Sequence, residues 1–489
     1  MSTHANDTLT KADCQLQLQS TLEPLLDAGF ISRDCYTKIY SDLERFYALL
    51  RETPTNPEDY WVAFQKEFDF IQPGLDAIKV PMNAANLCPE PRPLLRAANE
   101  LRFELNRNVA QQTRMRGGLR ARQFDEARAA LARSVRIAVP KNLAIVRNAS
   151  EANNAINGGY RKWSAPGSRR DNVILWDQNH PTNLAAWELR GGRKIIPGQP
   201  APDPVGHVFD IHMVVLPANV TPDQVAQHFI RHINESTRFI SFSETSNGNG
   251  VRIPEVAIQA IWNHVSSDPR YSNCHIHIDG TMAFGARQLD FSRPFCHSFV
   301  SSCHKWFLGP KETGILYIDP AKAINFEPNI FAYDYKIDIL NWNDLPKTAE
   351  RFELLGQRDD VNIITLLWTE LMWHNIGYSR AYSRVTELTR KLMIDLKECK
   401  WDVETPANAA MSLGVVWVKV PRGTQTIKLS DELYANGIAA SFSPTTNRTD
   451  ETRIRFCPHI YNTFADIHHA VDIMNQWRGP VPYSGSQSE

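Results

Sequence analysis

A lysine between two short apolar runs gives the first chemical indication in the sequence. Phe299-Val300 leads into small residues and then into His304-Lys305, and a second apolar run ends at Ile318. This pattern predicts a strand, a polar turn that holds Lys305, and another strand. A lysine at a strand end among aromatic side chains loses solvation, which lowers its pKa and frees an amine for Schiff-base chemistry.

An aspartate upstream supplies the complement to this lysine. The alternating run His275-Ile-His-Ile-Asp279 predicts a strand that ends at Asp279, about 26 residues before Lys305. In a pyridoxal 5'-phosphate (PLP) site, a carboxylate keeps the pyridine nitrogen protonated and a lysine holds the aldehyde as an imine. The two residues therefore predict a PLP site in which Lys305 and Asp279 are catalytic.

The same strand also permits a metal site, which is the alternative from another class of enzyme. His275, His277 and Asp279 alternate along the strand, so the two imidazoles and the carboxylate share one face, as in some metallohydrolases. No complementary set of ligands follows at a suitable spacing, and a metal site leaves His304-Lys305 unexplained. We therefore predict PLP as the cofactor and no metal.

The stretch around Lys305 resembles a known family. Ser302-Cys-His-Lys-Trp-Phe-Leu-Gly-Pro310 is similar to class V aminotransferases, which are fold-type I PLP enzymes, and within them to the branch of isopenicillin N epimerase-like proteins and cysteine desulfurases. The resemblance runs from about Asn83 to Trp477. It implies an α/β fold: a large domain with a mostly parallel sheet and helices on both faces, and a smaller α+β C-terminal domain. It also implies a homodimer with the active site at the interface.

The resemblance assigns roles around the cofactor. Ala149 and Ser150 begin a helix after the strand at 142–146; Ser150 can cap that helix, and its first-turn amides suit the cofactor phosphate. His180, which follows the strand at 173–176, would stack on the pyridine ring and is the third catalytic candidate. Asn247 would lie near the ring hydroxyl. The full set of predicted cofactor-binding residues is Ala149, Ser150, His180, Asn247, Asp279, Met282, Ser302, His304, Lys305 and Gln357.

Two members of this set depart from the family pattern. Met282 stands where many relatives carry Gln or His near the ring oxygen. Gln357 stands where the family has a threonine that reaches the phosphate of the neighbouring subunit. The substrate is predicted to be an amino acid, a small molecule, whose α-carboxylate is clamped by Arg455 through two parallel hydrogen bonds, with Arg453 as the fallback and Asn86 as a second contact.

The order of elements predicts four segments. Residues 1–80 form an N-terminal helical extension, 81–345 the large PLP-binding domain, 346–480 the small C-terminal domain and 481–489 a disordered tail. Strands alternate with helical stretches across 142–318, which favours a parallel sheet with ligands at the carboxyl ends of its strands.

Composition excludes several classes of partner. The 489 residues include 53 basic and 54 acidic side chains, so no strong field favours a nucleic acid or a membrane surface. No apolar run is long enough to span a membrane, and the first residues do not resemble a secretory signal. The eight cysteines lack paired spacing. We expect a cytoplasmic protein with reduced thiols.

The expected chemistry begins with an imine between PLP and the amino-acid substrate, after which the released lysine removes the Cα proton and leaves a carbanion. The stretch 439–448 contains no cysteine, which disfavours desulfuration through a persulfide and leaves a cysteine desulfurase/lyase as an alternative only. We expect epimerase-like or lyase/cyclase chemistry in secondary metabolism. The alternatives are a Mannich-type, carbon–carbon bond-forming cyclase of fungal alkaloid pathways, such as the loline pathway, and a non-catalytic binding protein.

Overall fold

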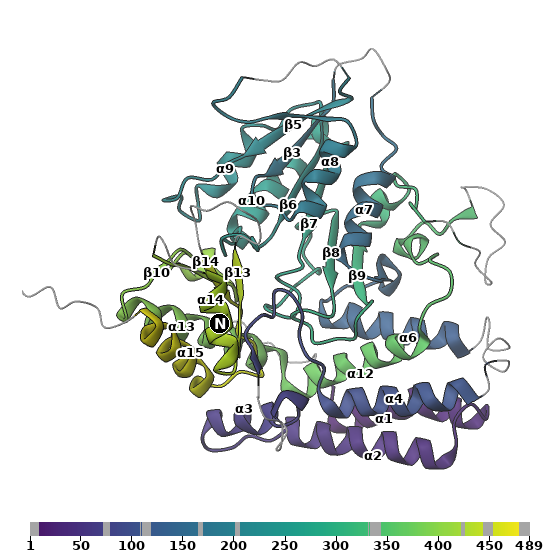
Figure 1. Cartoon of the computed structure of the whole chain (residues 1–489). Coiled ribbons are helices and arrows are strands. Elements are labelled where there is room, and N and C mark those ends of the chain that lie inside the picture. The colour runs from purple at the N-terminus through teal and green to yellow at the C-terminus, as the bar shows by residue number, and fades with distance from the viewer. Residues whose placement is uncertain are drawn as a thin grey trace, which may run out of the picture.

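An eight-stranded sheet organises the central part of the chain in the computed structural model (Figure 1). The strand order is β2–β9–β8–β7–β6–β3–β5–β4. The strands are β2 (Leu143–Val146), β3 (Asn172–Trp176), β4 (Gly192–Ile195), β5 (Phe209–Val214), β6 (Thr237–Ser243), β7 (His275–Asp279), β8 (Ser298–Ser302) and β9 (Gly314–Ile318). The structure describes residues 9–71, 79–107, 109, 119–164, 170–200, 206–330, 332, 344–421, 426–443 and 453–478.

Only β9 runs against its neighbours in this sheet, and the other seven strands are parallel. Most of their residues are buried, and in the edge strand β4 only Gly192 is. Val173 and Leu175 contribute to one apolar cluster, whereas Ile174 and Trp176 contribute to the other. Continuous apolar strands of this kind need helices on both sides, because neither face can meet water. The predicted fold class is confirmed.

Helices cover the two faces of the sheet. The apolar cluster on one face includes side chains of α7 and α8, and that on the other includes side chains of α6, α9 and α10. The bounds are α6 (Leu119–Ser134), α7 (Ala149–Gly159), α8 (Ala185–Leu189), α9 (Val225–Ile230), α10 (Glu255–Ser266) and α11 (Pro320–Ala323). We call this sheet with its helices the sheet unit.

A smaller antiparallel sheet forms the C-terminal unit. Its order is β10–β11–β14–β13, with a separate parallel pair of β1 and β12. The helices α13, α14 and α15 supply its apolar cluster. The bounds are β1 (Val80–Pro81), β10 (Asp402–Val403), β11 (Val416–Lys419), β12 (Ile438–Ala439), β13 (Ser441–Ser443), β14 (Arg453–Phe456), α13 (Tyr378–Glu398), α14 (Thr426–Ala435) and α15 (Phe464–Arg478).

The N-terminal helices pack beneath the sheet unit with α4 and α12 (Figure 1). They bury side chains against α12: the Tyr47 hydroxyl donates to the Trp368 carbonyl at 2.9 Å, and the Trp368 indole donates to the Thr21 hydroxyl at 3.3 Å. The bounds are α1 (Lys11–Asp27), α2 (Arg33–Leu50), α3 (Pro57–Gln65), α4 (Arg92–Arg107) and α12 (Asp360–Ile376).

The packing of α12 bears on the expected domain boundaries. The side chains of α12 belong to the cluster shared by the N-terminal helices and the sheet, whereas those of α13 belong mainly to the C-terminal cluster. Gly377, with φ of 85°, joins the two helices in a conformation that favours glycine. We propose that the C-terminal unit begins near Tyr378 rather than at 346. The expected tail at 481–489 lies outside the described residues.

Candidate active site

A cavity of about 250 Å³ lies at the carboxyl ends of the parallel strands. Residues after β2, β3, β6, β7 and β8 reach it, because parallel strands deliver their carboxyl ends to one edge of a sheet. Its lining residues are Asn148, Ala149, Ser150, His180, Thr182, Ser243, Thr245, Asn247, Asp279, Thr281, Met282, Ser302, His304 and Lys305. Nine of the ten predicted cofactor-binding residues are therefore brought together.

The turn that carries Lys305 is held by its backbone carbonyls. Cys88 N donates to the His304 carbonyl at 3.0 Å, His459 Nε2 to the Trp306 carbonyl at 2.7 Å, and the Trp373 indole to the Phe307 carbonyl at 2.7 Å. Three distant segments thereby fix the turn. Burial lowers the pKa of Lys305, while the Asp279 carboxylate acts in the opposite direction. The amine is therefore more easily freed of its proton than an exposed lysine.

Asp279 has a defined orientation at the end of β7. Its Oδ2 accepts from Asn153 Nδ2 at 3.0 Å, and its Oδ1 accepts from Thr281 N at 3.1 Å. Gly280 follows, where a Cβ atom would lie only 1.8 Å from the ring of Phe299. The chain can turn away from the sheet directly after Asp279 because no side chain stands there.

A chain of buried hydrogen bonds leads to Asp279 from the interior of the sheet. Ser298 Oγ lies 2.8 Å from His275 Nε2 and 2.7 Å from His277 Nδ1, and His277 Nε2 lies 2.8 Å from Asn153 Oδ1. Because Asn153 gives its amide hydrogen to the carboxylate, its oxygen must accept from His277 Nε2–H. Ser298 then donates to His277 Nδ1 and accepts from His275. Both imidazoles are neutral, in agreement with their lowered pKa values, which burial causes.

His180 lies on the loop after β3 and lines the cavity. Its Nδ1 accepts from Thr182 N at 3.3 Å and lies 2.9 Å from the Thr182 hydroxyl, while its own backbone N–H donates to Ser243 Oγ at 3.3 Å. Burial lowers the pKa of His180. A neutral ring with its proton on Nε2 is therefore fixed at the wall of the cavity.

The predicted helix cap needs correction. Asn148, not Ser150, caps α7, and its side chain accepts from Glu151 N at 2.9 Å. Ser150 is instead the second residue of the helix and lines the cavity. Ser302 Oγ accepts from Ala149 N at 2.9 Å and joins β8 to the helix start. The positive end of α7 thus opens into the cavity, as an anion site requires.

Arg455 lies on β14, and its guanidinium is buried and held by amide oxygens. Nη2 donates to Asn83 Oδ1 at 2.9 Å and Nη1 donates to Asn247 Oδ1. Its Nε atom is buried without a hydrogen-bond partner among the described residues. Arg453, the fallback, also has a buried Nε without a partner among the described residues, but its guanidinium is already engaged in an ion pair with Glu404 at 2.9 Å. Arg455 is therefore the better candidate for a substrate carboxylate.

Three predicted residues do not line the cavity of their own chain. Arg455 is one of them, but it binds Asn247, which does line the cavity. Asn86 is exposed, and the segment contributes Asn83 to Arg455 instead, because the turn after β1 directs only the earlier asparagine toward β14. Gln357 is exposed and does not line the cavity of its own chain. Its expected contact with a partner subunit remains a prediction.

Several polar atoms in the cavity wall fit a polar ligand. Thr245 Oγ1, Thr281 Oγ1 and His304 Nδ1 are buried and have no hydrogen-bond partner in the described part of the chain. Such groups are costly unless a ligand or water satisfies them. Met282 adds an apolar contact, and its sulfur accepts from the Trp306 indole at 3.4 Å. The N-terminus of α7 suits a phosphate, Asp279 suits a pyridine nitrogen and Lys305 suits an aldehyde, and these polar atoms lie around them in the same cavity.

The metal alternative finds no support from the same residues. Within the described ranges, no three His, Cys, Asp or Glu side chains are grouped as a metal site would need. His275 and His277 both engage Ser298 instead. None of the described helices has the length and apolar character to cross a membrane.

Comparison with known proteins identifies the family. Residues 83–469 match aminotransferase class-V. The chain belongs to the class V aminotransferase family. Its cofactor is PLP, and it is a PLP-dependent enzyme of fold type I. The expected extent of the resemblance, from Asn83 to Trp477, agrees closely with the matched range.

Individual relatives of this class V enzyme include two bacterial proteins. The chain is 24% identical to isopenicillin N epimerase of Streptomyces clavuligerus over 354 residues, which are 70% of this chain and 81% of that protein. It is 24% identical to a cysteine desulfurase of Dickeya dadantii over 197 residues, 40% of this chain and 41% of that protein.

Solved structures show the same fold. A mutant of C-DES with glycine covalently linked to its PLP cofactor has a TM-score of 0.68 at 19% identity, and the match covers 84% of this chain and 98% of that one. The apo cysteine desulfurase of Thermococcus onnurineus also has a TM-score of 0.68, at 16% identity, and covers 87% and 98%.

Part of the site lies outside the residues predicted from the sequence. Asn148, Thr182, Ser243, Thr245 and Thr281 line the cavity without having been predicted. Asn153 and His277 were also not predicted as part of the PLP site, and they form the hydrogen-bond chain that leads to Asp279. Asn153 lies one helical turn after Ala149, and His277 alternates with Asp279 on β7, so the spacing that suggested a metal site was also the indication of this hydrogen-bond chain.

Proposed function

We propose that this class V enzyme removes the Cα proton of an amino-acid substrate whose carboxylate binds Arg455, and that the outcome is epimerase-like or of the lyase/cyclase type. The observation that carries the proposal is the pairing of a buried lysine amine with a buried, pre-positioned guanidinium that has an unsatisfied Nε. When bound, PLP supplies the electron sink that stabilises negative charge at Cα.

Four residues of the chain would each have a separate role in this reaction. Arg455 orients the substrate through its carboxylate, and Lys305 Nζ takes the proton from Cα, helped by the burial that lowers its pKa. Asp279, held by Asn153 and Thr281 N, would hold the pyridine nitrogen of bound PLP in its protonated form. His180 excludes water from one side of the site.

Desulfuration by a persulfide is less well supported. The sequence has no cysteine between Cys399 and Cys457. Cys457 is fully buried, and burial raises the pKa of its thiol, as it does for Cys88. A nucleophilic cysteine needs an accessible thiolate instead. Membership of a loline-type pathway and ring closure through a new carbon–carbon bond remain predictions.

Hydrogen exchange tests the proposal. The holoenzyme is incubated in deuterium oxide with a panel of amino acids, and the Cα position and products are followed by NMR and mass spectrometry. Exchange without net conversion indicates epimerisation, and loss of a leaving group or ring closure indicates lyase or cyclase chemistry. Absence of Cα exchange with every amino acid would contradict the proposal.

The role of Arg455 has its own control. Arg455→Lys should raise KM by about tenfold or more, because the bidentate contact is lost. Arg453→Lys, on the same strand face, should have a much smaller effect. A larger rise of KM in Arg453→Lys than in Arg455→Lys would show that Arg453 binds the substrate carboxylate instead.

We also propose a homodimer. Gln357 is exposed and does not line the cavity of its own chain, which leaves it free to contact the cofactor of a partner. Analytical ultracentrifugation of the holoenzyme would give twice the chain mass. A monomer that retains full activity would contradict this.

A further inference from the structure

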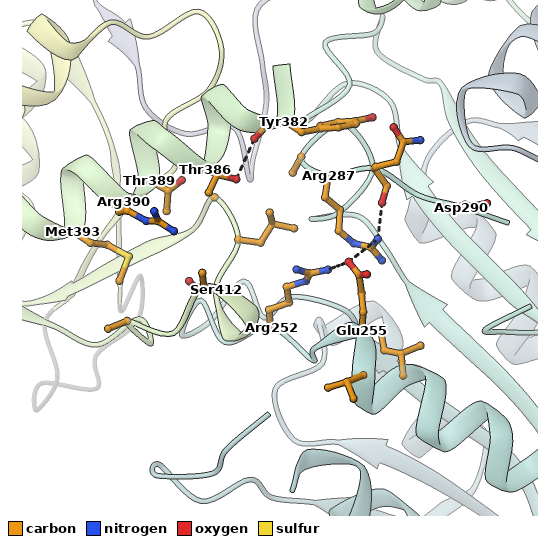
Figure 2. A pocket seen from close by; sticks show the side chains of 18 of the residues that line it. Arg252, Glu255, Arg287, Asp290, Tyr382, Thr386, Thr389, Arg390, Met393 and Ser412 are labelled. Carbon is orange, nitrogen blue, oxygen red and sulfur yellow. Dashed lines mark hydrogen bonds and ion pairs between the residues drawn. The ribbon is translucent and has the colours of Figure 1, made fainter. Parts of the chain in front are cut away.

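A second and larger cavity lies between the sheet unit and the C-terminal unit. Its volume is about 720 Å³, and it is bounded by α10, the segment 286–295, α13 and the segment 407–414 (Figure 2). We call it the interdomain cleft. None of the described residues that line it also lines the cavity around Lys305. Its size is in the usual range for small-molecule sites, which often lie between domains.

Part of the charge in the interdomain cleft is balanced. Arg252 and Arg287 both bind the buried Glu244, with Arg252 Nε 3.1 Å from Oε1 and Arg287 Nη2 2.8 Å from Oε2. Glu255 lies 2.8 Å from Arg252 and 3.3 Å from Arg287 (Figure 2). Asp290 pairs with Arg136, which lies outside the cleft, at 3.0 Å. These two arginines and these acids therefore leave no net charge for a ligand.

Three other cations of the interdomain cleft are not balanced. Arg293, Arg390 and Lys397 line it and are exposed, and none forms an ion pair within the part of the chain that the structure describes. Arg390 and Lys397 lie on α13, whereas Arg293 comes from the sheet unit. Positive charge therefore stands on both walls, and a low-dielectric cleft strengthens its field.

Apolar side chains lie between these cations. Val256 on α10 and Ile394 on α13 are unusually exposed for their type, at 57% and 47%, and Met393 lies beside Ile394. On α13 the positions 390, 393, 394 and 397 share one helix face, so apolar contact surface separates two cations. An aliphatic surface of this kind gains free energy when a ligand covers it.

We propose that the interdomain cleft is a second ligand site, which binds a small organic anion with an apolar body. A carboxylate or a phosphate group would meet the unbalanced cations, and the hydrocarbon part would cover Val256 and Ile394. The proposal is independent of the reaction at Lys305. A bound molecule would contact both units, and Glu244, held by two cleft arginines, donates its backbone N–H to the Asp279 carbonyl at 2.9 Å.

Calorimetric titration of the holoenzyme tests this site. The probe is anilinonaphthalene sulfonate, an anion with apolar rings, and PLP remains in place so that the catalytic cavity is closed to it. The test variant is Arg390→Glu/Lys397→Glu. The control, Lys66→Glu/Arg96→Glu, makes the same change of charge at two exposed positions outside the cleft.

We expect saturable binding to the wild type and the control, and about tenfold weaker binding to the cleft variant, because two attractive contacts become repulsive. Ile394→Asn should also weaken binding, and inorganic phosphate should bind far less well than the sulfonate. Equal affinity of the cleft and control variants would overturn the proposal. Binding of inorganic phosphate as tight as that of the sulfonate would also overturn the proposal. A third contrary result is that the cleft variant alone changes its sedimentation but binds the probe normally, which would make the cleft an interface between copies of the chain.

Discussion

At the residue scale, the reactivity of the site depends on one amine and on how little water reaches it. Lys305 lies in a turn whose carbonyls are bound by three distant donors, so the backbone that carries its side chain is fixed in position. Burial disfavours its charged form, and Arg455 adds to that effect after burial itself. A neutral amine is the nucleophile and base that PLP chemistry uses.

Replacement of this lysine gives the first prediction. Lys305→Ala should lose the visible absorbance of covalently held PLP and its activity, because no other described lysine lines the cavity. Absorbance spectra are recorded after exhaustive dialysis. The control is Lys311→Ala, an exposed lysine six positions later, which should keep the spectrum. Retention of the band by Lys305→Ala would place the covalent link elsewhere.

At the element scale, α7, β7 and β8 cooperate to orient Asp279. The hydrogen-bond chain from His275 through Ser298, His277 and Asn153 has one consistent direction, and each donor points toward the carboxylate. Networks of this kind polarise successive bonds and fix the orientation of the final acceptor. The helix α7, whose N-terminus we propose as the phosphate site, therefore also orients Asp279 through Asn153.

Removal of one link should show this function. Asn153→Ala leaves Asp279 without a side-chain donor, and loss of a hydrogen bond to a buried carboxylate costs about 1–3 kcal/mol. We expect kcat to fall about tenfold or more with PLP still bound. Steady-state kinetics and cofactor absorbance measure the two effects. Asn154→Ala on the same helix, which does not contact Asp279, should leave kcat nearly unchanged.

At the scale of the whole molecule, α12 joins the N-terminal helices to the sheet. It is buried on nearly all sides, and His374 near its end contacts the Leu9 carbonyl at 3.1 Å. Glu370 lies in this interior, where burial raises its pKa to about 7, and the Tyr378 hydroxyl donates to it at 3.0 Å. A buried carboxyl group with a raised pKa makes the stability of the folded chain depend on pH.

The sign of this dependence follows from proton binding. Between 4.5 and about 7, folded Glu370 holds a proton that the unfolded chain has released, so the free energy of unfolding falls as pH rises through this window. Glu370→Gln removes the effect and keeps an acceptor for Tyr378. We expect it to stabilise the protein by about 3 kcal/mol near pH 8 and very little near pH 4.5.

Chemical denaturation at the two pH values measures the difference. Glu398→Gln, at an exposed position on α13, serves as the control and should change the stability little at either pH. A destabilised Glu370→Gln variant at pH above its folded pKa would show that the carboxylate is charged and compensated in the native protein.

The sequence by itself determined the strands β2, β3, β7, β8 and β9, the turn with Lys305 and the acid at the end of β7. These depend on local patterns: alternation, short apolar runs and small residues at turns are set by neighbours in the chain. The family resemblance added His180, Ala149 and Ser150 at positions that the structure brings to one cavity.

Only the tertiary structure decided which nearby residue serves each role. Asn83 rather than Asn86 meets Arg455, and Asn148 rather than Ser150 caps α7, because the exact angle of a turn selects between close neighbours. The chain behind Asp279 and the interdomain cleft join segments more than a hundred positions apart, which the strand order and the packing of α13 on the sheet unit bring together. Local pattern carries no information about such distances.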